Sequence, residues 1–285
     1  MSHDEEDTRV PPVSLRRQRG AGGAKALLLT VFGEFVLPHS APVWTSTLLH
    51  VLAGLDVEEK SARQALTRLA ADRWIVSERV GRRVRWALTD HGRALLTEGA
   101  ERIYSFGRDR ESWDGRWLVL LASVPETKRD LRHRLRNGLT WAGMGSPAPG
   151  VWISPHVSRE PEAKQVVESL GLDAEVLSFC GPFGGIGSES EMVEQAWHLG
   201  ELAASYEDFV REFAGMRPAP GDEVLLDQTR LVHAWRRFPR LDPQLPLDLL
   251  PPHWIGVRAA NVFKDLHRQW HDSAQARWAE LAANG

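Results

Sequence analysis

The segment KSARQALTRLAADRWIVSERVGRRVRWAL, residues 60–88, decides the expected fold. In its first half the apolar residues recur three and four positions apart, which predicts a helix over residues 58–73 with one buried face. Its second half predicts two strands, 74–79 and 83–88, joined around Gly81, because glycine accepts the positive φ of a tight turn. Strand alternation puts Trp86 toward the core and Arg85 on the opposite face. The expected buried residues of the helix are Ala62, Ala65, Leu66, Leu69 and Ala70.

Two more helices are expected before this segment. Residues 24–37, AKALLLTVFGEFVL, are rich in apolar residues and precede Pro38, which cannot continue a helix. The next helix is expected to begin at Ser40 and run to Gly54, with Pro42 in its first turn, where proline is tolerated. Three helices followed by a hairpin are the order of a winged helix-turn-helix domain, expected over residues 25–106 with a connector helix at 89–106. Residues 1–24 are too polar and too rich in glycine and proline to form a core, so they are predicted to be a disordered tail.

The remaining sequence predicts two further domains and an α+β fold class. Short apolar strands alternate with amphipathic helices over residues 107–188, which predicts a central ferredoxin-like α/β domain. Residues 189–285 are mainly helical and form the expected C-terminal domain, with a role in dimerisation or effector binding. The expected strands are 117–124, 150–155 and 173–180, and the helices between them 126–138 and 159–171. The tryptophans expected in the core are Trp74, Trp117, Trp152, Trp197 and Trp235.

Positive charge is concentrated in one part of this chain. The 285 residues carry a formal net charge of -3, yet residues 60–93 hold nine basic and three acidic residues, a local charge of +6. Such an asymmetry is typical of a surface that binds nucleic acid. An acidic N-terminus and the lack of an apolar run of about 18 residues predict a cytoplasmic, nucleoid-associated protein with no membrane partner. The single cysteine excludes an intramolecular disulfide.

The basic segment is therefore a candidate surface for double-stranded DNA. Arginine side chains recognise guanine and glutamine recognises adenine, whereas arginines of a wing suit phosphates or the minor groove. A solvated hairpin without a function is the alternative. The candidate residues are Lys60, Ser61, Arg63, Gln64, Thr67 and Arg68 on the helix, and Arg79, Arg82, Arg83 and Arg85 on the hairpin.

Patterns typical of enzymes and metal sites are weak in this sequence. It contains no GxxxxGK[ST], HExxH or GxSxG motif and no GxGxxG after a strand, so no catalytic residue and no cofactor is predicted. His267 and His271 lie four residues apart on a predicted helix, but a pair without a third ligand nearby is more often a surface pair, so no metal site is expected. Cys180, which precedes the glycine-rich residues 181–187, is expected to be a buried cysteine at a strand end.

Five motifs in this order resemble the PaaX family, the transcriptional repressors of bacterial phenylacetate degradation. They are SARQALTRLAADRWI followed by RVGRRVRWALTDHG, then WDGRWLVLL at 113–121, GMGSPAPGVWISP at 143–155, AWHLGELAASYEDFVREF at 196–213 and DPQLPLDLLPPHWIG at 242–256. The resemblance implies a homodimer, a recognition helix at Lys60–Arg73 and phenylacetyl-coenzyme A as the inducer. A two-fold dimer would bind an inverted-repeat operator.

The resemblance also implies a middle domain similar to a small CRISPR-associated nuclease. Ser123 lies where nuclease-like relatives place a metal-binding aspartate, and Asp114 precedes the strand instead. This difference argues against nuclease activity, so a metal-dependent nuclease is kept only as the alternative function, and a DNA-binding protein without a ligand is a third. We expect a repressor that is not an enzyme.

An acyl-coenzyme A effector carries phosphates and an acyl group, so its pocket needs cations beside an apolar wall. Helix packing and surface salt bridges are the alternative roles of such residues. The candidate effector-binding residues are Arg132, Arg134, His233, Arg236, Arg237 and Trp254.

Overall fold

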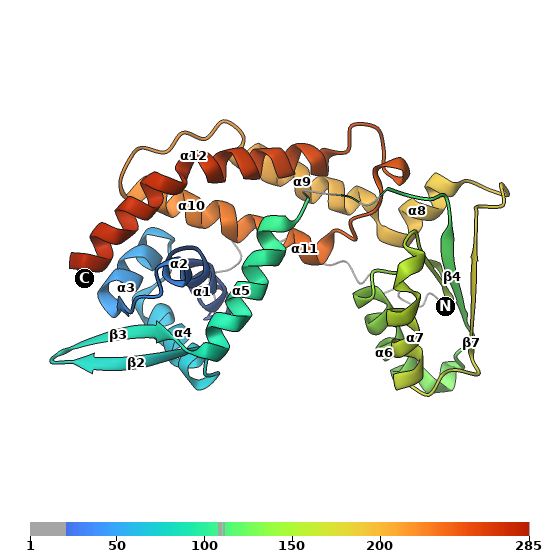
Figure 1. Ribbon diagram of the computed structural model, residues 1–285, viewed down its shortest axis with the longest axis horizontal. Coiled ribbons are helices and arrows are strands. Elements are labelled where there is room, and N and C mark those ends of the chain that lie inside the picture. Colours follow the sequence, from blue (N-terminus) through green and yellow to red (C-terminus); the bar gives the residue numbers. More distant parts are fainter. Residues whose placement is uncertain (1–20, 108–109, 111, 285) are drawn as a thin grey trace, which may run out of the picture. The chain divides into compact units, whose positions relative to one another are not determined.

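The computed structural model describes residues 21–107, 110 and 112–284, which form two compact units. Unit 1 contains the residues up to Ser105 together with Arg211–Arg237 and the residues from Asn261; unit 2 contains Phe106–Val210 and Phe238–Ala260 (Figure 1). This division differs from the three consecutive domains that we expected, because two C-terminal stretches pack with the N-terminal part of the chain. Of the expected tail, residues 1–24, the first 20 lie outside the described residues, whereas residues 21–24 are part of the first helix.

Unit 1 contains the three helices and the hairpin that the sequence predicts. The first helix begins at Ala21, includes one π-helical turn, and continues through Pro38 to His39, two residues beyond its expected end. The elements are α1 (Ala21–Val31), η2 (Phe32–Val36), α2 (Leu37–His39), β1 (Val43–Trp44), α3 (Thr45–Gly54), α4 (Glu59–Ala71), β2 (Ile75–Val80), β3 (Arg83–Leu88), α5 (Asp90–Ser105), α10 (Asp222–Trp235) and most of α12 (Ile255–Asn284).

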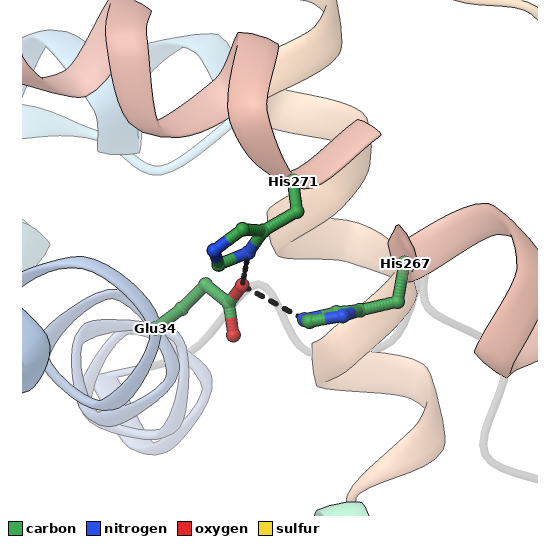
Figure 2. Close-up of side chains that lie close together, drawn as sticks. All are labelled: Glu34, His267 and His271. Carbon is green, nitrogen blue, oxygen red and sulfur yellow. Dashed lines mark hydrogen bonds and ion pairs between the residues drawn. The ribbon is translucent and has the colours of Figure 1, made fainter. Parts of the chain in front are cut away.

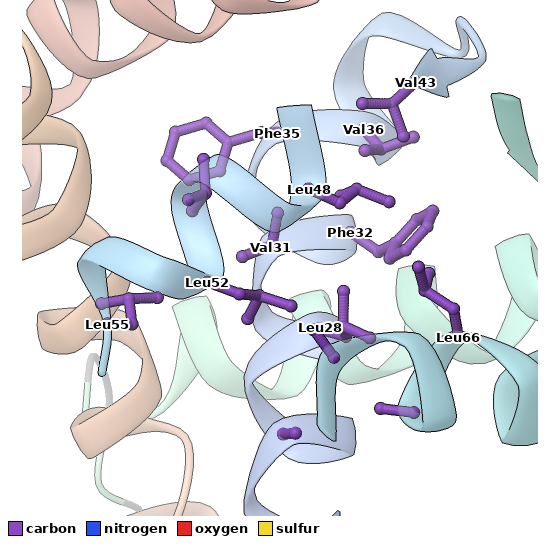
Figure 3. Close-up of a cluster of buried hydrophobic side chains, with 14 of the residues drawn as sticks. Leu28, Val31, Phe32, Phe35, Val36, Val43, Leu48, Leu52, Leu55 and Leu66 are labelled. Atoms are coloured by element: carbon purple, nitrogen blue, oxygen red, sulfur yellow. The ribbon is translucent and has the colours of Figure 1, made fainter. Parts of the chain in front are cut away.

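The apolar faces of α1, α3 and α4 meet in one core (Figure 3). The face of α4 is buried as its spacing predicts, with Ala70 partly buried at its edge. Leu225 of α10 and Trp278 of α12 belong to the same core, and the Trp278 ring stacks on Phe35 with centroids 5.2 Å apart. The core therefore joins residues more than 200 positions apart in the sequence.

A three-stranded antiparallel sheet of order β1-β3-β2 packs on these helices. Gly81 has a φ of 61° and forms a two-residue turn with Arg82, as the glycine predicts. Trp86 packs against the core of unit 1 and its Nε1 donates a 2.9 Å hydrogen bond to Thr45 Oγ1. The expected inward orientation of Trp86 is confirmed.

Unit 2 is built on a second sheet, with α6 and α7 packed on one of its faces and α8 against β5. The sheet is antiparallel with the order β5-β6-β4-β7, and its chain order is β-α-β-β-α-β. Apolar residues of α6 and α7 form a core with Leu118, Leu120 and Trp152 of the strands. The elements are β4 (Trp117–Ala122), η3 (Glu126–Lys128), α6 (Arg129–Trp141), β5 (Gly145–Ala148), β6 (Val151–Ser154), η4 (Val157–Arg159), α7 (Glu160–Ser169), β7 (Val176–Gly181), α8 (Glu189–Trp197), α9 (Leu199–Phe213), α11 (Phe238–Leu241) and η5 (Leu247–Leu249).

Several expected burials are corrected by the structure. Trp117, Trp152 and Trp235 are buried as expected, whereas Trp74 and Trp197 are only partly buried.

Cys180 is exposed, so its expected burial was wrong. The reason is that β7 is an edge strand, and four of its six residues are exposed.

Among the described residues no helix is both long and apolar enough to cross a bilayer.

Candidate nucleic-acid interface

The polar face of α4 is exposed, opposite the face that packs in the core. Five of the six candidate residues of α4 are exposed, namely Lys60, Arg63, Gln64, Thr67 and Arg68, and Ser61 is half-buried. Because successive turns of a helix place residues three and four apart on one side, these side chains form one continuous surface. A shallow hollow in this surface is lined by Glu59, Lys60, Arg63, Gln64 and Thr67.

Arg63 already has a partner on this surface. Its Nη2 and Nε lie 2.8 Å from Glu59 Oε1, and its backbone carbonyl accepts a 3.0 Å hydrogen bond from Thr67 Oγ1. Both ionic side chains are more than half exposed, so this pair contributes little stability. An incoming guanine or phosphate must therefore compete with Glu59 for the guanidinium.

The hairpin projects from the helices of unit 1 with Arg82 at its turn (Figure 1). Arg79 Nε donates to the carbonyl oxygen of Gly81 over 3.2 Å, and the guanidinium of Arg83 lies 3.8 Å from the ring centroid of Trp44. In the described part of the chain Arg82 has no carboxylate partner, and its side chain is exposed at the tip.

Arg85 forms a two-pronged ion pair with Glu78, its cross-strand neighbour. Its Nε and Nη2 each lie 2.9 Å from a carboxylate oxygen of Glu78. The expected outward orientation of Arg85 is confirmed, but the sequence interpretation missed its partner. Register counting from the Gly81–Arg82 turn would have found Glu78. Trp44 was missed because the two-residue strand that holds it has no pattern of its own.

The expected effector residues do not form one cluster. His233, Arg236 and Arg237 lie in unit 1, whereas Arg132, Arg134 and Trp254 lie in unit 2. His233 Nδ1 is 3.0 Å from Thr30 Oγ1, and Arg236 Nη1 donates over 2.7 Å to the carbonyl oxygen of Ala26. Burial, and secondly the charge of Arg236, lower the pKa of His233 to about 4. His233 and Arg236 thus make the helix-packing contacts that were the alternative to an effector role.

In unit 2, Trp254 is buried with its ring edge-on to Tyr206, at a centroid distance of 6.2 Å. Arg132 and Arg134 are exposed on α6. Tyr206 also lines a cleft of about 390 Å³, within the size range of small-molecule sites. None of the expected effector residues lines this cleft. Its walls are Phe106, Gly107, Arg110, Ser112, Tyr206, Leu247, Asp248, Gly256, Val257 and Ala260.

His267 and His271 have a third neighbour that the sequence interpretation missed (Figure 2). Glu34, in the π-helical turn of residues 32–36, is 4% exposed, and its Oε1 lies 3.0 Å from His267 Nε2 and 3.9 Å from His271 Nδ1. Burial raises the pKa of Glu34, but hydrogen bonds and the charge of His267 outweigh it, so the pKa is lowered overall. The expectation of a histidine pair without a third ligand was wrong. An acid within the apolar stretch 24–37 was the signal, since acids are rarely buried without a partner.

Three family models match successive parts of the chain. They are described as PaaX-like protein over residues 23–92, PaaX protein central Cas2-like domain over 110–193, and PaaX-like protein C-terminal domain over 197–280. The transcriptional repressor PaaX of Escherichia coli K12 is 29% identical over 264 residues, which are 88% of this chain and 81% of that protein. The solved structure of the uncharacterized protein Rv0674 from Mycobacterium tuberculosis has a similar fold, with a TM-score of 0.59 and 19% identity, over 90% of this chain and 98% of that one.

Proposed function

The chain belongs to the PaaX family, and from this premise we propose that it is a DNA-binding repressor of phenylacetate-type catabolic genes. We infer further that an acyl-coenzyme A thioester such as phenylacetyl-coenzyme A releases it from its operator. The relative that carries a function in its name is a transcriptional repressor, a regulator and not an enzyme. The nuclease alternative finds no support in that comparison.

The exposed polar face of α4 is the observation that carries the proposal. We assign α3 and α4 to a helix-turn-helix with the four-residue turn 55–58, and β2 and β3 to its wing. The β-α-β-β-α-β order of unit 2 supports a ferredoxin-like middle domain. In this assignment α4 enters the major groove, where Arg63 and Gln64 meet base edges, while the wing arginines meet phosphates or the minor groove.

The effector is expected to use two kinds of surface. Exposed Arg132 and Arg134 on α6 have the charge that phosphates require, and the unit 2 cleft has the apolar wall that an acyl group requires. Trp254 supports that wall through its contact with Tyr206. His233 and Arg236 are weaker candidates, because their polar atoms already contact α1.

DNA selection with the full chain tests the proposal. Duplexes retained from a randomised pool are expected to contain an inverted repeat, and phenylacetyl-coenzyme A, but not free coenzyme A or phenylacetate, is expected to release them. Gln64→Ala should weaken the selected site by about 1–3 kcal/mol and relax specificity at one base pair, since it removes a bidentate contact. Gln195→Ala, at an exposed position on α8, is the matched control. Recovery of no consensus, or equal effects of the two substitutions, would contradict the assignment of α4.

A further inference from the structure

We propose that Glu34, His267 and His271 bind a divalent transition-metal ion, with Zn²⁺ the best match. The three ligand atoms all lie within 4.8 Å of one another (Figure 2). Tetrahedral Zn²⁺ with bonds of about 2.0–2.1 Å places its ligand atoms about 3.4 Å apart. The 3.0 and 3.9 Å separations from Glu34 Oε1 to the two imidazoles lie on either side of that value, so small ring rotations admit an ion.

The carboxylate of Glu34 is held in place from several sides. Gln228 Nε2 donates to Oε1 over 2.8 Å, and the Tyr104 hydroxyl donates to Oε2. Gln275 Nε2 donates over 2.9 Å to the backbone carbonyl of Glu34, which lies in the π-helical turn. Outer hydrogen bonds of this kind orient the carboxylate ligands of metal sites, and π-helical turns occur frequently at functional sites.

One ligand atom lacks a partner that a metal ion would supply. His271 Nδ1 is buried and has no hydrogen-bond partner among the described residues. A buried polar atom without a partner costs free energy, which coordination to an ion would remove. The rest of the His271 side chain is 44% exposed, so solvent reaches the edge of the site and gives an ion a route of entry.

The ligand set determines the class of ion. Two imidazole nitrogens and one carboxylate oxygen suit Zn²⁺ and other first-row transition metals, whereas Ca²⁺ and Mg²⁺ prefer oxygen ligands only. The ion would connect the π-helical turn at residues 32–36 to α12, the two elements whose Phe35 and Trp278 belong to the core of unit 1. Binding to the folded chain alone raises its stability by mass action. This site does not depend on the proposed function, because it is defined by residues outside the DNA-facing surface.

Calorimetric titration of the chelator-treated full chain with ZnCl₂ tests the site, together with thermal unfolding with and without the ion. We expect one equivalent of Zn²⁺ and a higher Tm in its presence. His271→Ala and the double variant His267→Ala/His271→Ala should lower the affinity at least tenfold, as expected on loss of a direct ligand, and abolish the rise in Tm. His91→Ala, which changes an exposed histidine on α5, should behave as the parent.

Circular dichroism of the His271→Ala chain verifies that a loss of binding is not a loss of fold, since the side chain is nearly half exposed. A parent that takes up no Zn²⁺ would overturn the proposal. Unchanged affinity in the double variant would overturn it too, because binding would then lie elsewhere, for example at exposed Cys180.

Discussion

Gly92 lies in the first turn of α5, directly against the backbone of Trp74. A Cβ atom at this position would lie 1.9 Å from the Trp74 carbonyl oxygen, a group that cannot rotate away. Gly99 lies on the same helix and has no neighbouring atom within 4 Å of its Cβ direction. A substitution at Gly92 therefore tests the lack of space for a side chain, whereas one at Gly99 tests helix propensity alone.

We expect Gly92→Ala to lower the free energy of unfolding by at least about 1–3 kcal/mol, the range for overpacked positions. Gly99→Ala should raise it by about 0.5–1 kcal/mol, because alanine is the better helix former. Urea unfolding of the parent and both variants measures the difference. Shifts of the same sign would refute the close approach of α5 to Trp74.

His233 gives unit 1 a dependence on pH. Burial keeps its pKa at about 4 in the folded chain, against 6.5 as the ordinary value, so as the pH falls the unfolded chain takes up the proton first. The free energy of unfolding is therefore unaffected by His233 above about pH 6.5 and falls between pH 6.5 and 4. The total loss is about 3 kcal/mol, at about 1.4 kcal/mol for each pH unit.

Urea unfolding at pH 7 and at pH 5 checks this loss. In a His233→Gln chain, which retains a polar group near Thr30, the decrease between the two pH values should be smaller than in the parent. Equal decreases in both proteins would mean that His233 is not the responsible group.

At the residue scale the sequence predicted the exposure of those candidate residues whose surroundings are local. Helical spacing was enough to identify the exposed face of α4, because residues three and four positions apart lie on the same side of a helix. Glu34 and its histidines are more than 230 positions apart, and no periodicity connects them.

The β2–β3 hairpin is the element to which the proposed function assigns contacts with DNA of any sequence. Its arginines are not equivalent, because Arg85 is paired with Glu78 and Arg83 lies on Trp44, whereas Arg82 is exposed at the turn. If the hairpin binds DNA as proposed, we expect Arg82 to be the first of these arginines that an approaching phosphate meets.

We expect Arg82→Ala to weaken binding to specific and unrelated duplexes alike. The slope of log affinity against log salt concentration should fall in magnitude by about 0.9, the value for one lost phosphate contact. Fluorescence anisotropy across a salt series measures this slope. Arg268→Ala, an exposed arginine on α12 whose side chain is 78% exposed, should leave the slope unchanged. Identical slopes for Arg82→Ala and the parent would remove the wing from the interface.

Helices and strands with a long periodic pattern of apolar residues were predicted from the sequence. Those with a short or irregular pattern were not. The α4 helix and the two hairpin strands follow periods that the sequence shows directly. Strand β5, GSPA, has neither alternation nor β-branched residues, and it was not predicted. The helical stretch expected from residue 189 onward is divided at His198, which has a φ of 49° and separates α8 from α9.

The chain as a whole has an apolar surface that suits a second copy. Leu121, Leu177 and Phe179 lie on the face of the unit 2 sheet opposite the buried Leu118 and Leu120, and they are 41%, 62% and 55% exposed. Exposed apolar groups of this kind are typical of interaction surfaces. If two copies bind the proposed two-fold operator, we expect this face to form their contact.

Phe179→Glu is expected to convert the dimer to a monomer, because it places a charge in an apolar contact. Sedimentation velocity measures the change. Val76→Glu replaces an apolar residue of similar exposure, 53%, on the hairpin of unit 1 and should leave the dimer intact. A monomeric parent, or a dimeric Phe179→Glu protein, would refute the assignment.

The arrangement of units was the least predictable level. Composition and element order suggested three consecutive domains, but α10 and most of α12 pack in unit 1. The amphipathic patterns of α10 and α12 indicate that each helix buries one face. They do not indicate which part of the chain covers that face, because the contacts join residues distant in the sequence.

The discontinuous construction of unit 1 has a genetic consequence. Leu225, Ala274 and Trp278 belong to a core whose other buried residues lie between Ala24 and Ile75, so a premature stop codon anywhere before α10 removes part of the support of α4. Truncated products would lose the Trp278 ring that stacks on Phe35, and under the proposed function they would fail to occupy an operator. Nonsense alleles of this gene are therefore expected to be recessive, whereas dominant-negative alleles should be substitutions that leave the full-length fold intact.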